Sequence, residues 1–298
     1  MKSLVITGAT GMIGSAIVRQ AIKQDYKVAC IVHRESKRMA NIPQDSHVSV
    51  VKCNIDEYSS LNNEGSYDAF IHLAWDKTSV AGRDDVDTQL KNIQYTLDAV
   101  RLASRCGCKV FIGAGSQAEY GIQSVPLTGN LPVQPESGYG IAKFTAGKLG
   151  GMLCRQLGIR FNWLRILSIY GRNDGENTLI SYVMRELEAG RSPELTKCEQ
   201  LWDYLNCEDA AKAFFAVLEK GIDGKVYPLG SGKGRKLSAY VEDIRDVIDS
   251  SIELGFGKKD YYPHQPMYLV ADISELTEDT GWKPEIDFIK GIKNNVNK

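Results

Sequence analysis

The chain has 298 residues, of which 43% are hydrophobic and 24% are charged, a composition that is ordinary for a globular protein with a large core. Its 36 basic and 37 acidic residues give a net charge of −1, so neither a nucleic acid nor a membrane surface is expected as a partner. No apolar run approaches the roughly 20 residues that span a bilayer, and we expect no signal peptide.

The first predicted strand, Leu4 to Ile6, runs into three glycines at a G-x-x-G-x-x-G spacing and then into a helix. Glycines at such a turn let the backbone approach a pyrophosphate, whose charge is stabilised at the helix N-terminus. This spacing differs from the commonest dinucleotide fingerprint, G-x-G-x-x-G, and glycines also mark plain turns. We expect a phosphate-binding loop made of Gly8, Thr10, Gly11, Met12, Ile13 and Gly14.

Strands and helices alternate through the first half of the chain. Further strands are predicted at 27–32, 48–52, 69–73, 109–112 and 161–166, with amphipathic helices such as 16–23 and 90–104 between them. This alternation predicts an α/β fold with a doubly wound parallel sheet, in which ligands bind beyond the carboxyl ends of the strands.

The pattern changes after about Tyr170. Helices are predicted at 177–189, 210–220 and 237–248, and short strands at 226–229 and 267–270. We expect a dinucleotide-binding domain at 1–170 and a smaller mixed α/β lobe at 171–298. That lobe is mainly substrate-binding, and its segment of about 201–230 returns to the first domain. The active cleft is expected between the two.

The end of the second strand indicates which nicotinamide cofactor binds. About 20 residues after the glycines, a carboxylate binds a ribose 2′-hydroxyl, whereas an arginine accommodates a 2′-phosphate. Here the strand ends in His33 and Arg34, followed by Ser36 and Arg38, with no acid at the strand end. We therefore favour NADP(H), with NAD(H) as the alternative, since such a basic run is also typical of a solvated turn.

The next two strand ends also indicate cofactor contacts. Asn54 and Ile55 follow the third strand, and the Asn54 amide offers a donor and an acceptor to an adenine. The fourth strand runs through His72 into Leu73, Ala74 and Trp75, where the small Ala74 lets the backbone lie close to a cofactor. His72 itself is expected to be a hydrogen-bonded core residue.

Tyr139 and Lys143 place a phenol and an ammonium group four residues apart, so on a helix they share one face. The pKa of a tyrosine is ordinarily near 10, and a neighbouring cation stabilises the phenolate and lowers that pKa. Ser116 lies in a predicted loop of small residues, 113–121, at the carboxyl end of the sheet. It either hydrogen-bonds a substrate carbonyl or alkoxide, or serves only as a turn residue.

Together these residues resemble the extended short-chain dehydrogenase/reductases, specifically the branch of NAD(P)-dependent nucleotide-sugar epimerases, dehydratases and reductases. The resemblance covers nearly the whole chain and implies a Rossmann fold for the doubly wound sheet. It rests on the three glycines, Leu73-Ala74, Asn92, Ser116 ahead of Tyr120-Gly121, Tyr139 with Lys143, Arg165 ahead of Tyr170-Gly171, and the run 202–210.

The resemblance implies a role for each residue of the catalytic group. Tyr139 would donate or accept a proton at a sugar hydroxyl or ketone, while Lys143 binds the nicotinamide ribose and lowers the tyrosine pKa. Ser116 would orient the sugar oxygen. Asn92 is included among the cofactor contacts on the same ground. The expected substrate contacts are Ser116, Gln117, Tyr139, Ser168 and Asn177.

Departures from the family pattern narrow the activity. The 4,6-dehydratases carry an Asp-Glu pair directly after the catalytic serine or threonine, whereas this chain has Gln117-Ala118. Glu119 is displaced by one position and is expected to face elsewhere, so dehydration is not expected. Ser168 stands where the family often has asparagine, and Trp202 where it often has arginine. Both changes alter the expected diphosphate contacts, for which Asn177 is the better candidate.

The leading hypothesis is NADPH-dependent reduction of a keto group on a nucleotide-diphosphate sugar of the 4-keto-6-deoxy type. The alternative is a nucleotide-sugar 4-epimerase that uses the same residues and holds NAD(P) tightly. A non-catalytic NADP-binding regulator would usually lose the tyrosine or the lysine, and this chain keeps both.

Quaternary structure and location are also expectations from the sequence. The helix after Tyr139 contains Gly147, Gly150 and Gly151, which indicates close helix packing, either within the monomer or in a homodimer of the kind that relatives often form. We expect the homodimer. The seven scattered cysteines favour reduced thiols in the cytoplasm. No metal site is expected, because the only close pair, Cys106 and Cys108, lacks zinc or redox spacing.

Overall fold

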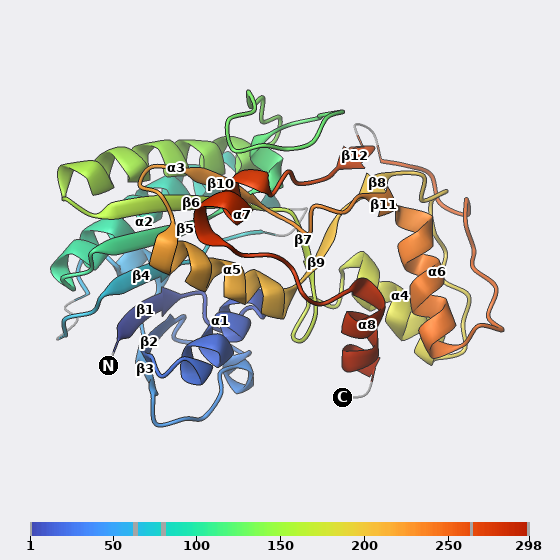
Figure 1. Ribbon diagram of the computed structural model, residues 1–298, viewed down its shortest axis with the longest axis horizontal. Helices are drawn as coiled ribbons and strands as arrows, with labels where there is room; N and C mark the ends of the chain where they lie inside the picture. Colours follow the sequence, from blue (N-terminus) through green and yellow to red (C-terminus); the bar gives the residue numbers. More distant parts are fainter. Residues whose placement is uncertain (1, 62–64, 79–81, 263–264, 297–298) are drawn as a thin grey trace.

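The computed structural model describes residues 2–61, 65–78, 82–262 and 265–296 (Figure 1). Its main feature is a seven-stranded sheet in the order β10-β6-β5-β4-β1-β2-β3, in which all neighbours are parallel. The strands are β1 Ser3–Thr7, β2 Lys27–Val32, β3 Val48–Lys52, β4 Ala69–His72, β5 Val110–Ser116, β6 Arg160–Ile166 and β10 Val226–Leu229. The predicted doubly wound parallel sheet is therefore confirmed.

Both faces of this sheet are buried, which explains the continuous apolar runs of its central strands. Along β1, Leu4 and Ile6 point into one core, and Val5 between them points into the other. The helices α1 (Met12–Lys23) and α5 (Cys207–Lys220) pack together on the first side. Covering the second side are α2 (Val86–Arg105) and α3 (Gly138–Gln156), which also pack against each other.

The other lobe surrounds a third core and lies to the right in Figure 1. Its helices are α4 Leu179–Glu188, α6 Leu237–Ile248 and α8 Phe288–Val296. Its strands form two small sheets, β11-β8-β12 and β7-β9. Their bounds are β7 Ser168–Tyr170, β8 Leu201–Trp202, β9 Tyr204–Asn206, β11 Arg235–Lys236 and β12 Tyr268–Leu269.

Part of the second half of the chain belongs to the large sheet. β10 pairs with β6 at its edge, and α5 lies against α1. The short helix α7 (Ser274–Thr280) packs on α5. Single turns of 3-10 helix occur at η1 Met39–Asn41, η2 Ile55–Glu57 and η4 Gln117–Glu119.

The glycines of α3 make room for aromatic side chains of β6. A Cβ atom on Gly147 would lie 2.8 Å from the Trp163 ring, and one on Gly151 would lie 3.1 Å from Phe161. Real Cβ atoms almost never come as close as the first of these distances, so glycine is required for this approach. Packing within the chain, the alternative to the expected homodimer, therefore accounts for Gly147 and Gly151.

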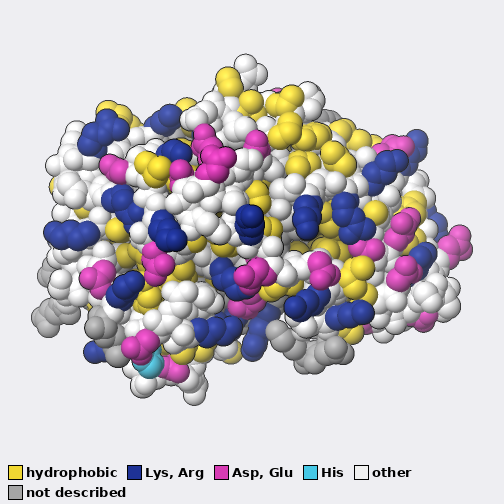
Figure 2. Space-filling view, in the orientation of Figure 1, with side chains coloured by type: hydrophobic (Ala, Val, Ile, Leu, Met, Phe, Trp, Pro, Cys, Tyr) yellow, Lys and Arg dark blue, Asp and Glu magenta, His cyan; other side chains and the backbone are white. Residues whose placement is uncertain are grey.

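The surface carries mixed charge. On the face drawn in Figure 2, basic and acidic side chains are interspersed, and hydrophobic side chains gather over the loop between η4 and α3. In that loop Ile122 and Val125 are exposed. Among the helices of the described residues, none is long and apolar enough to cross a membrane.

Candidate active site

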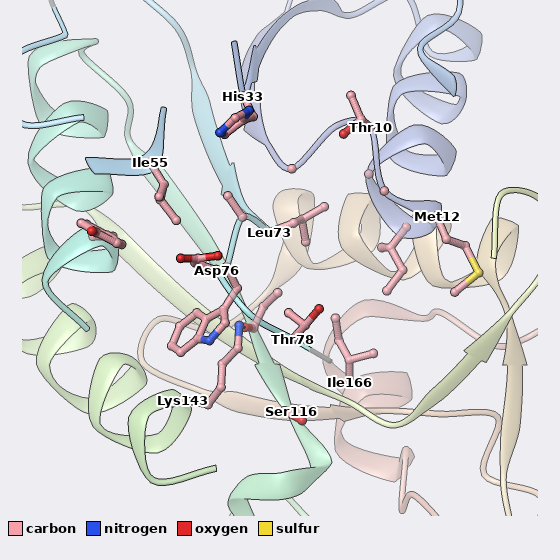
Figure 3. Close-up of a pocket in the computed structure, with 18 of the residues that line it drawn as sticks. Thr10, Met12, His33, Ile55, Leu73, Asp76, Thr78, Ser116, Lys143 and Ile166 are labelled. Carbon is pink, nitrogen blue, oxygen red and sulfur yellow. The ribbon is translucent and has the colours of Figure 1, made fainter. Parts of the chain in front are cut away.

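A cavity of about 840 Å³ lies at the carboxyl ends of the central strands. The glycine loop and the ends of β2 and β3 line one part of it, and the end of β5 and the start of α3 line another. Figure 3 shows Thr10 and His33 at one end, and Ser116 and Lys143 at the other. The position matches the rule that ligands of doubly wound sheets bind beyond the strand ends.

The glycine loop between β1 and α1 is tightly built. Gly8 has a φ of +74°, and a Cβ atom there would lie 2.9 Å from the backbone of Leu73 and Ala74. A Cβ atom on Gly14 would collide with the Gly8 carbonyl oxygen. Glycine at these two positions therefore allows the loop to pack closely against the end of β4 and the start of α1.

The first turn of α1 is suited to a diphosphate. Its N-cap, Gly11, has no side chain to accept hydrogen bonds from the helix amides, and the first turn contains no acid. The N-terminal amides and the positive end of the helix dipole therefore lack a partner from this turn. Because Gly11, Met12 and Ile13 line the cavity, these residues fit the pyrophosphate of a dinucleotide.

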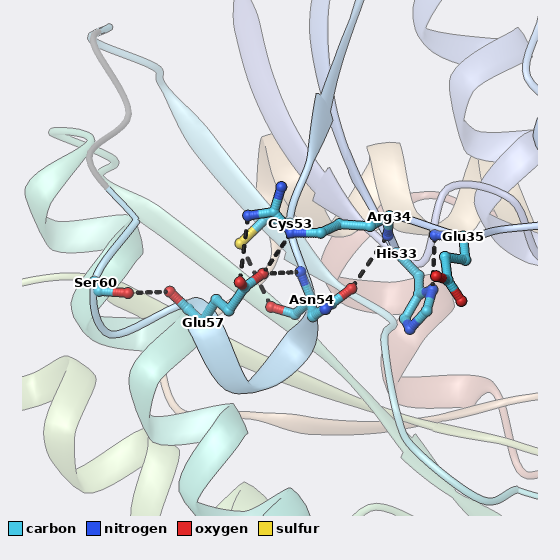
Figure 4. A network of polar contacts seen from close by, with 7 residues as sticks. All are labelled: His33, Arg34, Glu35, Cys53, Asn54, Glu57 and Ser60. Atoms are coloured by element: carbon cyan, nitrogen blue, oxygen red, sulfur yellow. Dashed lines mark hydrogen bonds and ion pairs between the residues drawn. The ribbon is translucent and has the colours of Figure 1, made fainter.

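The residues expected at the adenosine end are only partly brought together. His33, Arg38, Asn54 and Ile55 line the cavity. Arg34 lies outside the lining, because its guanidinium donates to the Glu57 carboxylate, with Nε–Oε2 3.0 Å and Nη2–Oε1 3.3 Å (Figure 4). Ser36 is also outside the lining, although its hydroxyl lies 3.4 Å from that of Thr10.

The end of β4 behaves as expected except at Asn92. Leu73, Ala74 and Trp75 line the cavity, and His72 is a buried core residue 2.8 Å from the Thr7 hydroxyl. Asn92 is buried outside the lining. Its amide accepts from the Asp76 backbone N at 2.9 Å and donates to the Asp76 carbonyl at 3.0 Å. This corrects the expected cofactor contact, since the side chain holds the loop after β4 instead.

The three predicted catalytic residues converge. Ser116, Tyr139 and Lys143 all line the cavity. Lys143 is 4% exposed, donates to the Ala114 carbonyl at 2.7 Å, and lies 5.8 Å from the Tyr139 ring centroid. The Ser116 side chain caps η4 by accepting from the Ala118 backbone N at 3.2 Å. Ser116 is thus a turn residue and a cavity residue at once.

The start of α3 is held by its own cap and by a neighbouring loop. The Ser137 hydroxyl accepts from the Gly140 backbone N at 3.1 Å, and Asp84 accepts from the Gly138 backbone N at 2.8 Å. The Tyr139 backbone N donates to the Arg83 carbonyl at 2.7 Å. The Arg83 guanidinium also faces the Tyr139 ring, 5.4 Å from its centroid. No sequence pattern had pointed to Arg83.

Burial sets the protonation of the Tyr–Lys pair. It raises the pKa of the Tyr139 phenol, an effect that the Ser116 hydroxyl and Arg83 partly offset. It lowers the pKa of Lys143 to about 7, against the attraction of Glu119. At neutral pH the phenol therefore carries its proton, while the amine is close to its titration midpoint.

Glu119 supports the catalytic loop from behind. It is completely buried and accepts from the Ser116 backbone N at 2.8 Å, from Trp163 Nε1 at 2.9 Å, and from Arg165 Nε at 2.8 Å. It does not line the cavity, so the expectation that it faces elsewhere is confirmed. Its structural role was missed, although Ser116 and Glu119 have the spacing of a capping box.

The expected substrate contacts also divide. Gln117 and Ser168 line the cavity, whereas Asn177 is exposed outside it, just before the Thr178 N-cap of α4. The Ser168 hydroxyl accepts from Trp202 Nε1 at 2.8 Å. The two positions that depart from the family pattern therefore contact each other. Other lining residues that sequence reasoning missed are Tyr58, Asp76, Thr78, Tyr95, Ile166 and Leu167.

The sequence pattern of the NAD dependent epimerase/dehydratase family matches residues 4–230, which is most of the chain. The chain belongs to this family. A putative UDP-glucose 4-epimerase of Methanocaldococcus jannaschii is 26% identical, over 99% of this chain and 97% of its own. CDP-abequose synthase of Salmonella typhimurium is also 26% identical, over 97% and 96%.

A solved structure agrees with these sequence relatives. UDP-N-acetylglucosamine 4-epimerase from Methanobrevibacter ruminantium M1, in complex with UDP-N-acetylmuramic acid, is 25% identical and superposes with a TM-score of 0.89. The match covers 99% of this chain and 97% of that one. These three relatives are therefore similar to this chain over nearly their full length.

The lining residues that adjoin Ser116 in the chain carry no carboxylate. Among the described residues that line the cavity, the acids are Asp56 and Asp76, and neither adjoins Ser116 in the chain. The adjacent lining residue is Gln117, whose amide does not titrate. The site therefore offers the Tyr139 phenol, the Ser116 hydroxyl and the Lys143 amine for proton transfer.

Proposed function

We propose that this enzyme reduces a keto group on a nucleotide-diphosphate sugar of the 4-keto-6-deoxy type, using NADPH. The observation that carries the proposal is the convergence of Ser116, Tyr139 and Lys143 at one end of a cavity whose other part is a glycine loop suited to a diphosphate. A bound nicotinamide dinucleotide would supply the hydride. Membership of the epimerase/dehydratase family supports the same substrate class.

The protein's own residues would manage the proton and the oxygen. Tyr139 would donate its phenolic proton to the oxygen of the reduced carbonyl, which requires the neutral phenol that burial favours. The Ser116 hydroxyl would hold that oxygen. Lys143 in its ammonium form would stabilise the phenolate that remains, and would bind the nicotinamide ribose.

The preference for NADPH rests on the basic residues at the adenosine end. His33 and Arg38 line this part of the cavity, and neither side chain is acidic. Arg34 lies beside them and is 55% exposed, so it can turn towards a 2′-phosphate. Gln117 and Ser168 would contact the sugar or its diphosphate from the lining. Asn177 would need to move from its exposed position to do so.

A 4-epimerase is the second candidate, and the relatives favour it. The putative UDP-glucose 4-epimerase and the UDP-N-acetylglucosamine 4-epimerase match nearly the whole chain. The same three catalytic residues would serve this activity, because Tyr139 can return the proton that it takes. An epimerase would keep its cofactor between turnovers, whereas a reductase would release it.

We further propose that the enzyme is a cytoplasmic homodimer. The outer sides of α2 and α3 carry apolar side chains in water: Val86 is 72% exposed, Leu90 65% and Met152 56%. Exposed apolar side chains on two adjacent helices are typical of a protein interface. The seven scattered cysteines support a cytoplasmic location, where thiols stay reduced.

The test is turnover by the purified protein with a panel of keto-sugar nucleotides. Consumption of added NADPH supports the reductase. Epimer interconversion without added cofactor, together with a nicotinamide released on denaturation, supports the epimerase instead. Tyr139→Phe should reduce turnover at least about 100-fold, whereas Tyr67→Phe, outside the cavity lining, should not. Full activity of Tyr139→Phe would show that Tyr139 is not the acid.

A further inference from the structure

A carboxylate with no part in the proposed chemistry lies at the end of β3. Glu57 closes the η2 turn, and its Oε2 accepts from the Asn54 backbone N at 2.7 Å. The same oxygen accepts from Arg34 Nε at 3.0 Å, and Oε1 accepts from Arg34 Nη2 at 3.3 Å. Figure 4 shows the Arg34 guanidinium turned towards Glu57, with the His33 ring on the other side of the backbone.

This contact withholds a cation from the cavity. His33, next to Arg34 in the chain, and Arg38, four residues further on, line the cavity, and Arg34 does not. The Arg34 backbone N also donates to Asn54 Oδ1 at 3.2 Å, and Asn54 does line the cavity. The Arg34 guanidinium is therefore held outside the cavity lining, while its backbone is bonded to a residue of that lining.

The contact is one that a ligand can open. The two side chains are 55% and 38% exposed, and exposed ion pairs are weak. A phosphate offers the same fork-shaped guanidinium a bidentate partner of higher charge. Once Arg34 has moved to such a phosphate, the Glu57 carboxylate is left close to a second anion, which disfavours the complex.

We propose that Glu57 is a specificity-determining residue, which competes with the 2′-phosphate of the cofactor for Arg34 and so limits the preference for NADP(H) over NAD(H). The inference rests on the proposed function only in that a dinucleotide occupies this end of the cavity. An unphosphorylated ribose leaves the Arg34–Glu57 contact intact, so binding of NAD(H) does not have to break it. The enzyme should therefore discriminate less between the two cofactors than Arg34 alone would require.

Glu57→Gln is the test variant, because the amide oxygen can still accept from the Asn54 backbone N while the charge is lost. Calorimetry would measure the binding of 2′,5′-ADP, which carries the 2′-phosphate, and of 5′-AMP, which lacks it. We expect the variant to bind 2′,5′-ADP about fivefold more tightly and 5′-AMP unchanged. Glu57→Asp, which withdraws the carboxylate by one methylene, should have an intermediate effect.

Two controls isolate the contact. Glu186→Gln removes a carboxylate that binds Arg191 with the same two-atom geometry, at 2.7 and 3.1 Å, away from the cavity, and should change neither affinity. The Arg34→Ala variant should bind 2′,5′-ADP more weakly than the wild type. Adding Glu57→Gln to that variant should increase the affinity by less than half as much as Glu57→Gln does in the wild type.

The outcomes separate the two proposals. If the wild type binds both nucleotides and Glu57→Gln leaves their affinity ratio unchanged, Glu57 does not set specificity and the proposed function stands. Glu57 is likewise not the determinant if the gain persists in full without Arg34. If the wild type binds neither nucleotide, the dinucleotide site itself is wrong, and both proposals are overturned.

Discussion

Burial shifts the pKa values of two catalytic side chains in opposite directions. Burial raises the pKa of Tyr139 and lowers the pKa of Lys143 to about 7, because it disfavours the charged form of each. The phenol thus keeps its proton for a carbonyl oxygen. Lys143 can stabilise the phenolate left behind only while it is an ammonium ion, on the acid side of its pKa.

Carbonyl reduction should therefore slow as the pH rises through about 7, since Lys143 then loses its proton. The dependence of kcat on pH between 6 and 9 would measure this. Lys143→Arg, which stays charged throughout, should flatten the profile at a lower rate, whereas Lys148→Arg, outside the cavity lining, should leave it unaltered. A rate that increases from pH 6 to 8 would contradict the assignment.

Glu119 and Arg165 form a buried ion pair, with side chains only 1% and 4% exposed. Glu119→Gln should destabilise the fold by about 3–5 kcal/mol, because it leaves a buried guanidinium without its counter-charge. Chemical denaturation would measure the loss. Glu219→Gln, which breaks the exposed pair with Lys2, should cost less than about 1 kcal/mol. If Glu119→Gln lowered the free energy of unfolding by a similarly small amount, water would be hydrating the Arg165 guanidinium in the variant.

At the scale of elements, α3 allows two glycines to be compared within one helix. Gly147→Ala should destabilise the protein by about 1–3 kcal/mol, because its Cβ atom would lie 2.8 Å from Trp163. Gly150→Ala would place a Cβ atom 3.6 Å from Phe161, an ordinary contact, and should stabilise by up to about 1 kcal/mol. Thermal unfolding of both variants tests this. Equal effects would refute the packing argument.

The bounds of an element were predicted correctly where its own residues mark where it begins and ends. β2, β3, β10 and α6 have the predicted bounds. β5 extends to Ser116, where a loop of small residues was expected, because Gly113 and Gly115 make space for the Trp163 ring across the sheet. α2 begins at Val86, four residues before the predicted start, after an Asp85 N-cap that accepts from the Thr88 backbone N.

The candidate site was predictable where residues follow one another in the chain. The glycine loop, Ser116, and Tyr139 with Lys143 were predicted from their spacing together with the family resemblance, and all of them line the cavity. The capture of Arg34 by Glu57 could not be predicted, because it depends on the ends of neighbouring β2 and β3 being brought together. Asn92 was predicted from its place in the family pattern. That pattern did not reveal that its side-chain amide is hydrogen-bonded to the backbone of Asp76.

At the scale of the whole molecule, the two lobes are joined by a buried carboxylate. Asp203, between β8 and β9, accepts from the backbone N of Ser231 at 2.7 Å, of Gly232 at 3.0 Å and of Ala271 at 3.2 Å. It thereby ties the segment after β10, which belongs to the large sheet, to the segment after β12 in the other lobe. Asp203 directly follows Trp202, whose Nε1 donates to the hydroxyl of the cavity residue Ser168.

On the face of the sheet away from α1 and α5, the outer apolar residues of α2 and α3 are exposed to water. A second copy of the chain would cover them. We expect size-exclusion chromatography with light scattering to give twice the 33.0 kDa mass of the chain.

Leu90→Asp combined with Met152→Asp should convert this dimer to a monomer, because the change places charges in an apolar interface. Ile122→Asp, at a residue that is 47% exposed on a different element, should leave the dimer intact. If the wild type has the mass of one chain, these apolar residues do not mediate self-association.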